Sequence, residues 1–101
     1  SEPMADIHLY DVIRRPVVTE KTSAMADDHR QYTFEVDLRA NKIQIKEAVE
    51  VIFDVTVEKV ATMVMPAKHG RRGTRTYQRK KTWKKAVVTL APGHEIDLFN
   101  L

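Results

Sequence analysis

Cysteine is absent from this chain, which excludes disulfide bonds, thiolate catalysis and zinc sites built on thiolates. The absence fits a reducing compartment. No apolar run approaches the roughly 18 residues of a membrane-spanning helix, and the first ten residues lack the basic-then-apolar order of a signal peptide. The sequence therefore predicts a protein of the cytosol with no membrane partner.

Acidic residues are missing from one stretch altogether. Residues 66–85 carry nine Lys or Arg residues and no Asp or Glu, whereas the rest of the chain carries eight cations and fourteen anions. The overall charge of +3 hides this asymmetry. A charge distribution polarised in this way indicates that one face or loop meets a polyanion.

Patterns of catalysis and metal binding are missing as well. The sequence contains no Ser-His-Asp order, no P-loop and no glycine-rich nucleotide fingerprint. Asp27, Asp28 and His29 adjoin one another, but no second cluster stands at ligand spacing, so they do not predict a metal site. We therefore expect no enzyme, no cofactor and no small-molecule substrate. A small enzyme that holds a phosphorylated substrate with the basic stretch is the weakest of the alternatives.

Apolar periodicity predicts six regular elements. Strands are expected at 12–18, 31–38, 55–65 and 85–90, and helices at 20–28 and 41–53. This order predicts an α+β fold, with a mostly antiparallel four-stranded sheet packed with helices. A long basic hairpin loop at 66–82 joins the last two strands. We expect a single domain at 10–101, preceded by a loose tail at 1–9, with Thr19 and Asn41 as helix N-caps.

The same periods predict which side chains face the core. The apolar stripe of the second helix consists of Ile45, Ala48, Val49, Ile52 and Phe53. Alternation in strand 31–38 predicts a dry face of Tyr32, Phe34, Val36 and Leu38 and a wet face of Thr33, Glu35 and Asp37. In strand 55–65, the residues expected on the inward face are Val55, Val57, Ala61, Met63 and Met65.

The basic loop has the composition of a nucleic-acid contact. Ordinary hairpin loops take two to five residues, whereas this one takes about sixteen. Its cations suit phosphate oxygens and its flat rings suit unpaired bases. The RNA-binding residues predicted here are Lys68, His69, Arg71, Arg72, Arg75, Tyr77, Arg79, Lys80, Lys81, Trp83, Lys84 and Lys85. RNA is favoured over DNA because the sequence has no helix-turn-helix, zinc finger or basic zipper. Because nothing in the chain neutralises the loop, we expect it to be disordered in the isolated protein.

Two further pairs of cations are candidates for RNA contact. Arg14 and Arg15 precede Pro16 and either bind phosphate or lie on an exposed edge. Lys42 and Lys46 share the polar side of the second helix, where a solvated charged face is the competing interpretation.

Three stretches together resemble one known family. They read RRPVVTEKT at 14–22, ANKIQIKEAVEVIFDVTVEKVATM at 40–63 and WKKAVVTLAPGHEIDLF at 83–99. In this order and spacing they are similar to the universal large-subunit ribosomal protein family twenty-three, in its bacterial form. The resemblance covers residues 10–99, which is nearly the whole chain.

The resemblance implies a non-catalytic ribosomal protein. Its basic hairpin would bind large-subunit ribosomal RNA beside the nascent-peptide exit tunnel, next to neighbouring large-subunit proteins. It also implies that Glu20, with Val18, Thr19 and Lys21 beside it, docks ribosome-associated factors such as trigger factor and the signal recognition particle. From the residues alone, Glu20 could equally be a first-turn glutamate favoured by the helix dipole. The alternative function is a free-standing RNA-binding adaptor, which would bind many RNAs away from the ribosome.

Overall fold

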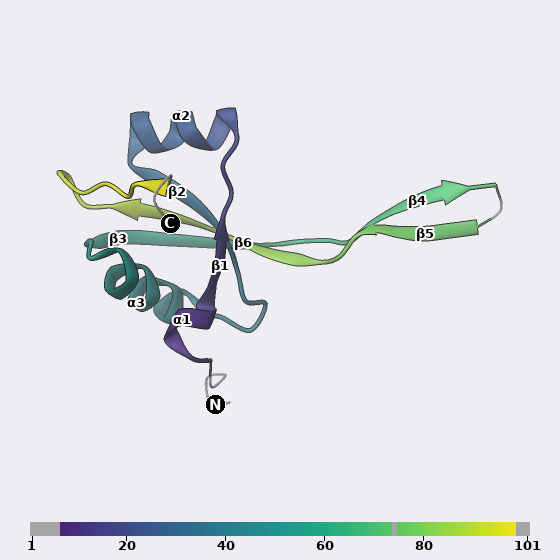
Figure 1. The fold of residues 1–101 in the computed structure, drawn as a ribbon, viewed down its shortest axis with the longest axis horizontal. Coiled ribbons are helices and arrows are strands. Elements are labelled where there is room, and N and C mark those ends of the chain that lie inside the picture. The colour runs from purple at the N-terminus through teal and green to yellow at the C-terminus, as the bar shows by residue number, and fades with distance from the viewer. Residues whose placement is uncertain (1–6, 74, 99–101) are drawn as a thin grey trace.

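A computed structural model describes residues 7–73 and 75–98, which form a four-stranded antiparallel sheet between helices and a separate two-stranded ribbon (Figure 1). The elements are α1 (Leu9–Val12), β1 (Ile13–Pro16), α2 (Glu20–His29), β2 (Gln31–Val36), α3 (Lys42–Phe53), β3 (Val57–Met65), β4 (Lys68–Arg72), β5 (Arg75–Lys80) and β6 (Trp83–Leu90). The sheet order is β1-β2-β6-β3, so β1 and β3 are its edges. The predicted α+β class and four-stranded antiparallel sheet are confirmed, while the short helix α1 was not predicted.

The two longer helices lie on opposite sides of the sheet, α2 above it and α3 with α1 below it (Figure 1). Both begin with reciprocal caps. The Thr19 side chain accepts from the Thr22 backbone N–H while the Thr22 hydroxyl accepts from the Thr19 N–H. Asn41 and Gln44 exchange the same two bonds at the start of α3. The predicted N-caps are confirmed, and they satisfy backbone donors that would otherwise lack partners.

The core lies between α3 and the sheet. Ile45, Ala48 and Val49 are fully buried, as the predicted stripe requires. The rings of Phe34 on β2 and Phe53 on α3 stack with their centroids 5.6 Å apart. Full burial of a Val, Ile or Phe side chain contributes about 1.5–3 kcal/mol. The core therefore fixes α3 and β2 against each other.

The chain before α1 also contributes to the core. Ile7 and Leu9 pack against it, half-buried, so the loose tail predicted for residues 1–9 does not extend to these two positions. Residues 1–6 and 99–101 lie outside the described residues.

Strand β2 is buried on both faces, which differs from the predicted dry and wet sides. Thr33 and Asp37 are 4% and 6% exposed, whereas Leu38 is 51% exposed. Phe34 faces α3, so its neighbour Thr33 points to the opposite face of the sheet, which α2 covers. The strand ends at Val36, so Leu38 no longer follows its alternation. The predicted burial of Leu38 and exposure of Thr33 and Asp37 are therefore wrong.

Strand β3 changes faces at a bulge between Val57 and Lys59. Val57 is buried in the core, and beyond the bulge it is Val60 that packs against the core. One extra residue moves every later side chain to the opposite face of a sheet. Met63 is consequently 44% exposed, and its predicted place in the core is wrong. Met65 shares its face and is half-buried.

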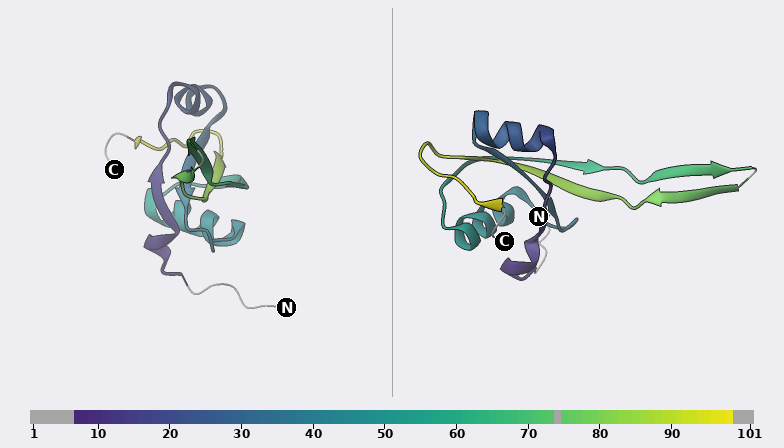
Figure 2. Two further views of the ribbon diagram at one scale, coloured as in Figure 1. Left: turned by 90° about the vertical axis from the view of Figure 1, so that its right-hand side faces the viewer. Right: turned by 45° about the horizontal axis from the view of Figure 1, so that its top comes forward.

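The basic stretch forms a paired ribbon instead of the loop predicted at 66–82. Strands β4 and β5 are antiparallel, with Lys68 opposite Lys80 at one end and Arg72 opposite Arg75 at the other. The turn between them contains Gly73 at a φ of 62°, in the left-handed region that glycine adopts readily. Figures 1 and 2 show the ribbon projecting from the body as a continuation of β3 and β6.

Candidate nucleic-acid interface

The ribbon concentrates positive charge on a narrow projection. From Lys68 to Lys81 the sequence has seven Lys or Arg residues and no Asp or Glu. The described side chains of Lys68, His69, Arg71, Lys80 and Lys81 are all exposed. Successive side chains of a strand point to opposite faces, so cations are available on both faces of the ribbon. The predicted contacts at Arg72, Arg75, Tyr77 and Arg79 concern side chains outside what the structure describes.

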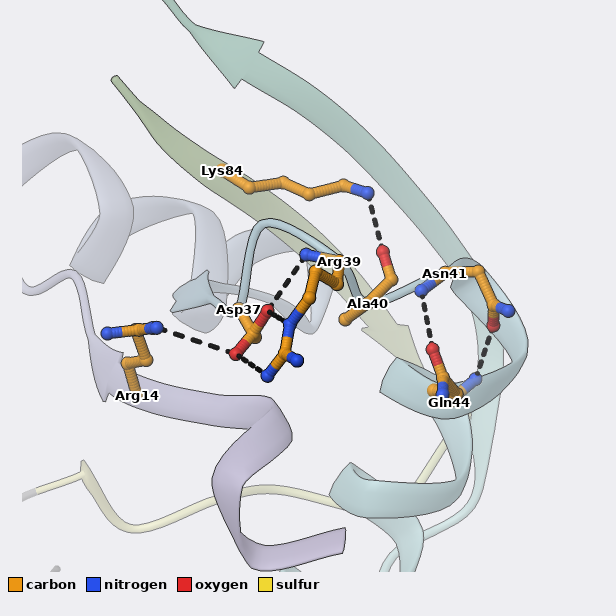
Figure 3. Close-up of polar contacts among 7 residues, drawn as sticks. All are labelled: Arg14, Asp37, Arg39, Ala40, Asn41, Gln44 and Lys84. Atoms are coloured by element: carbon orange, nitrogen blue, oxygen red, sulfur yellow. Dashed lines mark hydrogen bonds and ion pairs between the residues drawn. The ribbon is translucent and has the colours of Figure 1, made fainter. Parts of the chain in front are cut away.

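At the root of the ribbon, three predicted RNA-binding residues are half-buried: Trp83, Lys84 and Lys85. The Lys84 ammonium donates to the backbone carbonyl of Ala40, just before α3 (Figure 3). Lys85 lies directly opposite Glu35 in the β2–β6 register. Lys84 therefore fixes the β2–α3 connection to the sheet, and its charge is less accessible than that of the ribbon lysines.

Arg14 and Arg15 lie on the edge strand β1 and are paired with carboxylates. Arg15 Nε donates to Glu35 Oε1 at 2.9 Å, and Arg14 Nη2 donates to Asp37 Oδ2 at 3.4 Å. Their side chains are still 57% (Arg14) and 74% (Arg15) exposed. Because a guanidinium has five N–H donors, each arginine keeps donors available for a phosphate. Both interpretations of this pair, exposed edge and phosphate contact, are compatible with its position.

Asp37 is the buried centre of this polar cluster (Figure 3). The Arg39 backbone N–H and Nε donate to Oδ1 at 2.8 and 3.1 Å, and Arg39 Nη2 donates to Oδ2 at 3.2 Å. The Arg39 side-chain hydrogen bonds are the main reason that the pKa of Asp37 falls to about 2. The Arg39 backbone bond and the charges of Arg39 and Arg14 lower the pKa further, whereas burial opposes the shift. The cluster holds the connection from β2 to α3, and with it the base of the sheet next to the ribbon.

A pocket of about 820 Å³ lies where β1, the end of β2 and the root of the ribbon meet. Its lining residues are Arg14, Arg15, Pro16, Val17, Val18, Glu35, Val36, Leu38, Lys80, Lys81, Thr82 and Trp83. It brings together five predicted RNA-binding residues from two distant parts of the sequence, 14–15 and 80–83. Leu38 and Thr82 are members that sequence reasoning missed, and no local pattern marks them because the pocket depends on strand order.

The four predicted docking residues are together and accessible. Val18, Thr19, Glu20 and Lys21 are all exposed where α2 begins, and Val18 is 46% exposed. The Thr19 hydroxyl is engaged in the cap. Glu20 stands in the first turn, where the helix dipole favours a carboxylate. The site is therefore a preformed surface patch at the start of a capped helix.

Two other candidate groups lie apart from the ribbon. Lys42 and Lys46 are exposed on α3, which packs against β3 and α1 in the body (Figure 1). Asp27, Asp28 and His29 end α2. Within residues 7–73 and 75–98, no three or more His, Cys, Asp or Glu side chains group in a way that could hold a metal ion. No helix in that part of the chain is long and apolar enough to cross a membrane.

Comparison with known proteins decides the family. Residues 11–98 match the family model described as Ribosomal protein L23. The chain belongs to the ribosomal protein L23 family. The family resemblance predicted from the three sequence stretches is thereby confirmed. L23 proteins are structural ribosomal proteins and not an enzyme family.

Several curated relatives carry the name Large ribosomal subunit protein uL23. The protein of Desulfatibacillum aliphaticivorans is 48% identical over 94 residues, covering 93% of this chain and 98% of the relative. That of Geobacter sulfurreducens is 47% identical over 95 residues, covering 94% and 100%. That of Aquifex aeolicus is 47% identical over 91 residues, covering 88% of each. The ribbon, the pocket and the start of α2 all lie within the residues that match the L23 family model.

Proposed function

We propose that this chain is a structural constituent of the large ribosomal subunit and binds large-subunit ribosomal RNA through the β4–β5 ribbon. The observation that carries the proposal is the ribbon itself, a paired projection with seven cations and no anion between Lys68 and Lys81. The relatives' name, Large ribosomal subunit protein uL23, supports the choice of subunit. The protein then works in the cytoplasmic ribosome.

The physical basis of binding is the neutralisation of phosphates. Each Lys or Arg that meets a phosphate releases condensed counterions, which makes the affinity strong and dependent on salt. Strand pairing holds the ribbon cations in an extended row, so less conformational entropy is lost on binding than from a free loop. RNA phosphates in turn relieve the repulsion among the cations. The body, held by its core and by the Asp37 cluster, positions the row.

The site of assembly is the exit of the nascent-peptide tunnel, next to other large-subunit proteins. The ribbon occupies RNA there, while the start of α2 offers Val18, Thr19, Glu20 and Lys21 to ribosome-associated factors such as trigger factor and the signal recognition particle. Figure 1 supports two surfaces that centre on different elements, because α2 lies over the sheet and the ribbon projects away from the body. The two surfaces meet at Val18, which also lines the pocket beside the ribbon. In the docking patch, Glu20 contributes charge and Val18 apolar area.

Charge reversal on the ribbon tests this function. A tagged full-length chain carrying Lys68→Glu and Lys80→Glu is expressed in bacterial cells and its cosedimentation with large-subunit particles is measured. The matched control carries Lys21→Glu and Lys59→Glu, which change the net charge equally at exposed positions of the body. We expect the ribbon variant to lose about tenfold or more of its particle-bound fraction and the control to keep it. Equal incorporation of both variants would contradict the proposal.

A further inference from the structure

The pocket beside the ribbon has walls from segments far apart in the sequence. Strand β2 lies between β1 and β6 in the sheet, so its Glu35 and Val36 lie between β1 on one side and the ribbon root at Trp83 on the other. Neighbouring strands are about 4.8 Å apart, which separates β1 from β6 by roughly 10 Å. A volume of about 820 Å³ falls in the range of small-ligand sites.

Part of the pocket lining is apolar. Val18 and Leu38 are 46% and 51% exposed and both line it, with the half-buried indole of Trp83 between the ribbon and the sheet. Exposed aliphatic side chains that gather around an aromatic ring form a surface on which a flat ring can stack. Every nucleobase has such a face, which makes stacking on tryptophan a general feature of binding to unpaired RNA.

Another part of the pocket lining is cationic. Lys80 and Lys81 are exposed at the pocket's rim on the ribbon side, and Arg14 and Arg15 stand on the β1 side. Among the described residues that line the pocket, Glu35 is the one carboxylate, and Arg15 already pairs with it at 2.9 Å. An occupant with an aromatic ring and negative charge therefore matches both features of the pocket, whereas an uncharged apolar segment would supply no counter-charge to Lys80 and Lys81.

We propose that this pocket receives one unstacked nucleotide of the bound RNA, with the base against Trp83 and the aliphatic wall and the phosphates at Lys80 and Lys81. The inference rests on the proposed RNA-binding function and adds a base-binding site to it. Phosphate contacts along the ribbon do not distinguish paired from unpaired RNA, but a site for an extruded base does. The pocket thus selects an irregular RNA position and fixes the register of the ribbon on it.

Trp83 is the only tryptophan in the chain, so its fluorescence reports on the pocket alone. The full chain is titrated with a short oligoadenylate, with inorganic polyphosphate of similar charge, with polyglutamate and with adenosine monophosphate. We expect the oligoadenylate to quench Trp83 emission, because the base stacks on the indole. Polyphosphate should bind the ribbon, measured by its competition for the oligoadenylate, while leaving the emission of the free protein unchanged.

A variant pair separates the pocket from the ribbon. Leu38→Glu places a carboxylate in the pocket wall, and Val51→Glu places one at a similarly exposed position of α3 that does not line the pocket. Relative to polyphosphate, oligoadenylate should bind Leu38→Glu about tenfold more weakly and Val51→Glu unchanged. Circular dichroism checks that both variants are folded.

Each of the remaining results would contradict either the pocket, the RNA-binding function or the kind of ligand proposed. Oligoadenylate binding with unchanged Trp83 emission and an unaffected Leu38→Glu variant would refute the pocket and leave the ribbon's RNA binding in place. Absence of binding to both oligoadenylate and polyphosphate would refute the function and the pocket together. Quenching by adenosine monophosphate at equal concentrations would assign the pocket to a free nucleotide, and quenching by polyglutamate would assign it to an acidic peptide.

Discussion

Replacing Asp37 by asparagine tests the polar cluster that joins β2 to α3. In the parent protein, this buried carboxylate accepts three hydrogen bonds from Arg39 and one from Arg14 (Figure 3). The side-chain amide introduced by Asp37→Asn would keep one acceptor oxygen but present an N–H₂ group to an arginine. The substitution leaves the side-chain volume nearly unchanged, so the loss of stability reports on charge and hydrogen bonding.

The magnitude follows from the pKa of Asp37, which folding lowers from 3.8 to about 2. At 1.36 kcal/mol per pKa unit, this shift corresponds to about 2.5 kcal/mol of stabilisation at neutral pH. The side chains of Arg14 and Arg39 are 57% and 64% exposed, and solvent screening reduces the figure. We therefore expect Asp37→Asn to lower the free energy of unfolding by about 2 kcal/mol at pH 7, which is roughly 10 °C in Tm.

The pH dependence gives the sharper test. Because the folded pKa is the lower one, the stabilisation is complete above the unfolded pKa of about 4 and is lost as pH falls through about 2. Urea unfolding of parent and variant across this window should show the difference between them narrowing by about 2 kcal/mol. Glu35→Gln, which removes a more exposed ion pair with Arg15, should cost less than about 1 kcal/mol. A difference between parent and Asp37→Asn that stays constant from pH 7 to pH 2 would refute the electrostatic reasoning.

Three further outcomes are expected. Glu20→Lys should weaken binding of ribosome-associated factors to purified particles several-fold while leaving RNA binding intact. Asp27→Lys, at the other end of α2, should affect neither. If Glu20→Lys reduced RNA binding as much as factor binding, the result would contradict the assignment of the two functions to different surfaces. Lys68→Gln should reduce the slope of log affinity against log salt by about 0.7–0.9, whereas Lys59→Gln on β3 should leave the slope unchanged. In hydrogen exchange on the free protein, β4 and β5 amides should exchange much faster than those of β6, because the ribbon lacks the body's packed core, and should become protected on RNA binding. If the amides of β4 and β5 exchanged as slowly as those of β6 in the absence of RNA, the result would contradict the prediction that RNA binding stabilises the ribbon.

Local signals in the sequence were sufficient for much of the body. Asn41 and the apolar stripe at Ile45, Ala48 and Val49 predicted α3 because capping and a 3.6-residue period act within a few turns. The strands that flank the core followed from alternation in the same way. Burial that depends on a third element did not follow, and Thr33 is the example, because it lies on the face of β2 that α2 covers.

Register and strand order set the limits of the prediction. The bulge after Val57 moves Met63 out of the core, and no residue near it signals a bulge. The density of like charge predicts a loop at 66–82, whereas β4 and β5 pair through their backbones, which the side-chain charges do not prevent. The pocket joins Arg14 to Lys81 through the order β1-β2-β6, a relation that a single sequence does not contain. The cationic composition of the ribbon was thus predictable, and the position of the pocket beside it was not.

The most direct test of the central claim is crosslinking in cells, followed by sequencing of the RNA attached to this protein and mapping of the attached peptides. The account predicts reads concentrated in one compact region of large-subunit ribosomal RNA, with crosslinks on the ribbon and at Trp83. Reads spread over messages and small RNAs would contradict it and assign the protein to the class of free-standing RNA-binding adaptors.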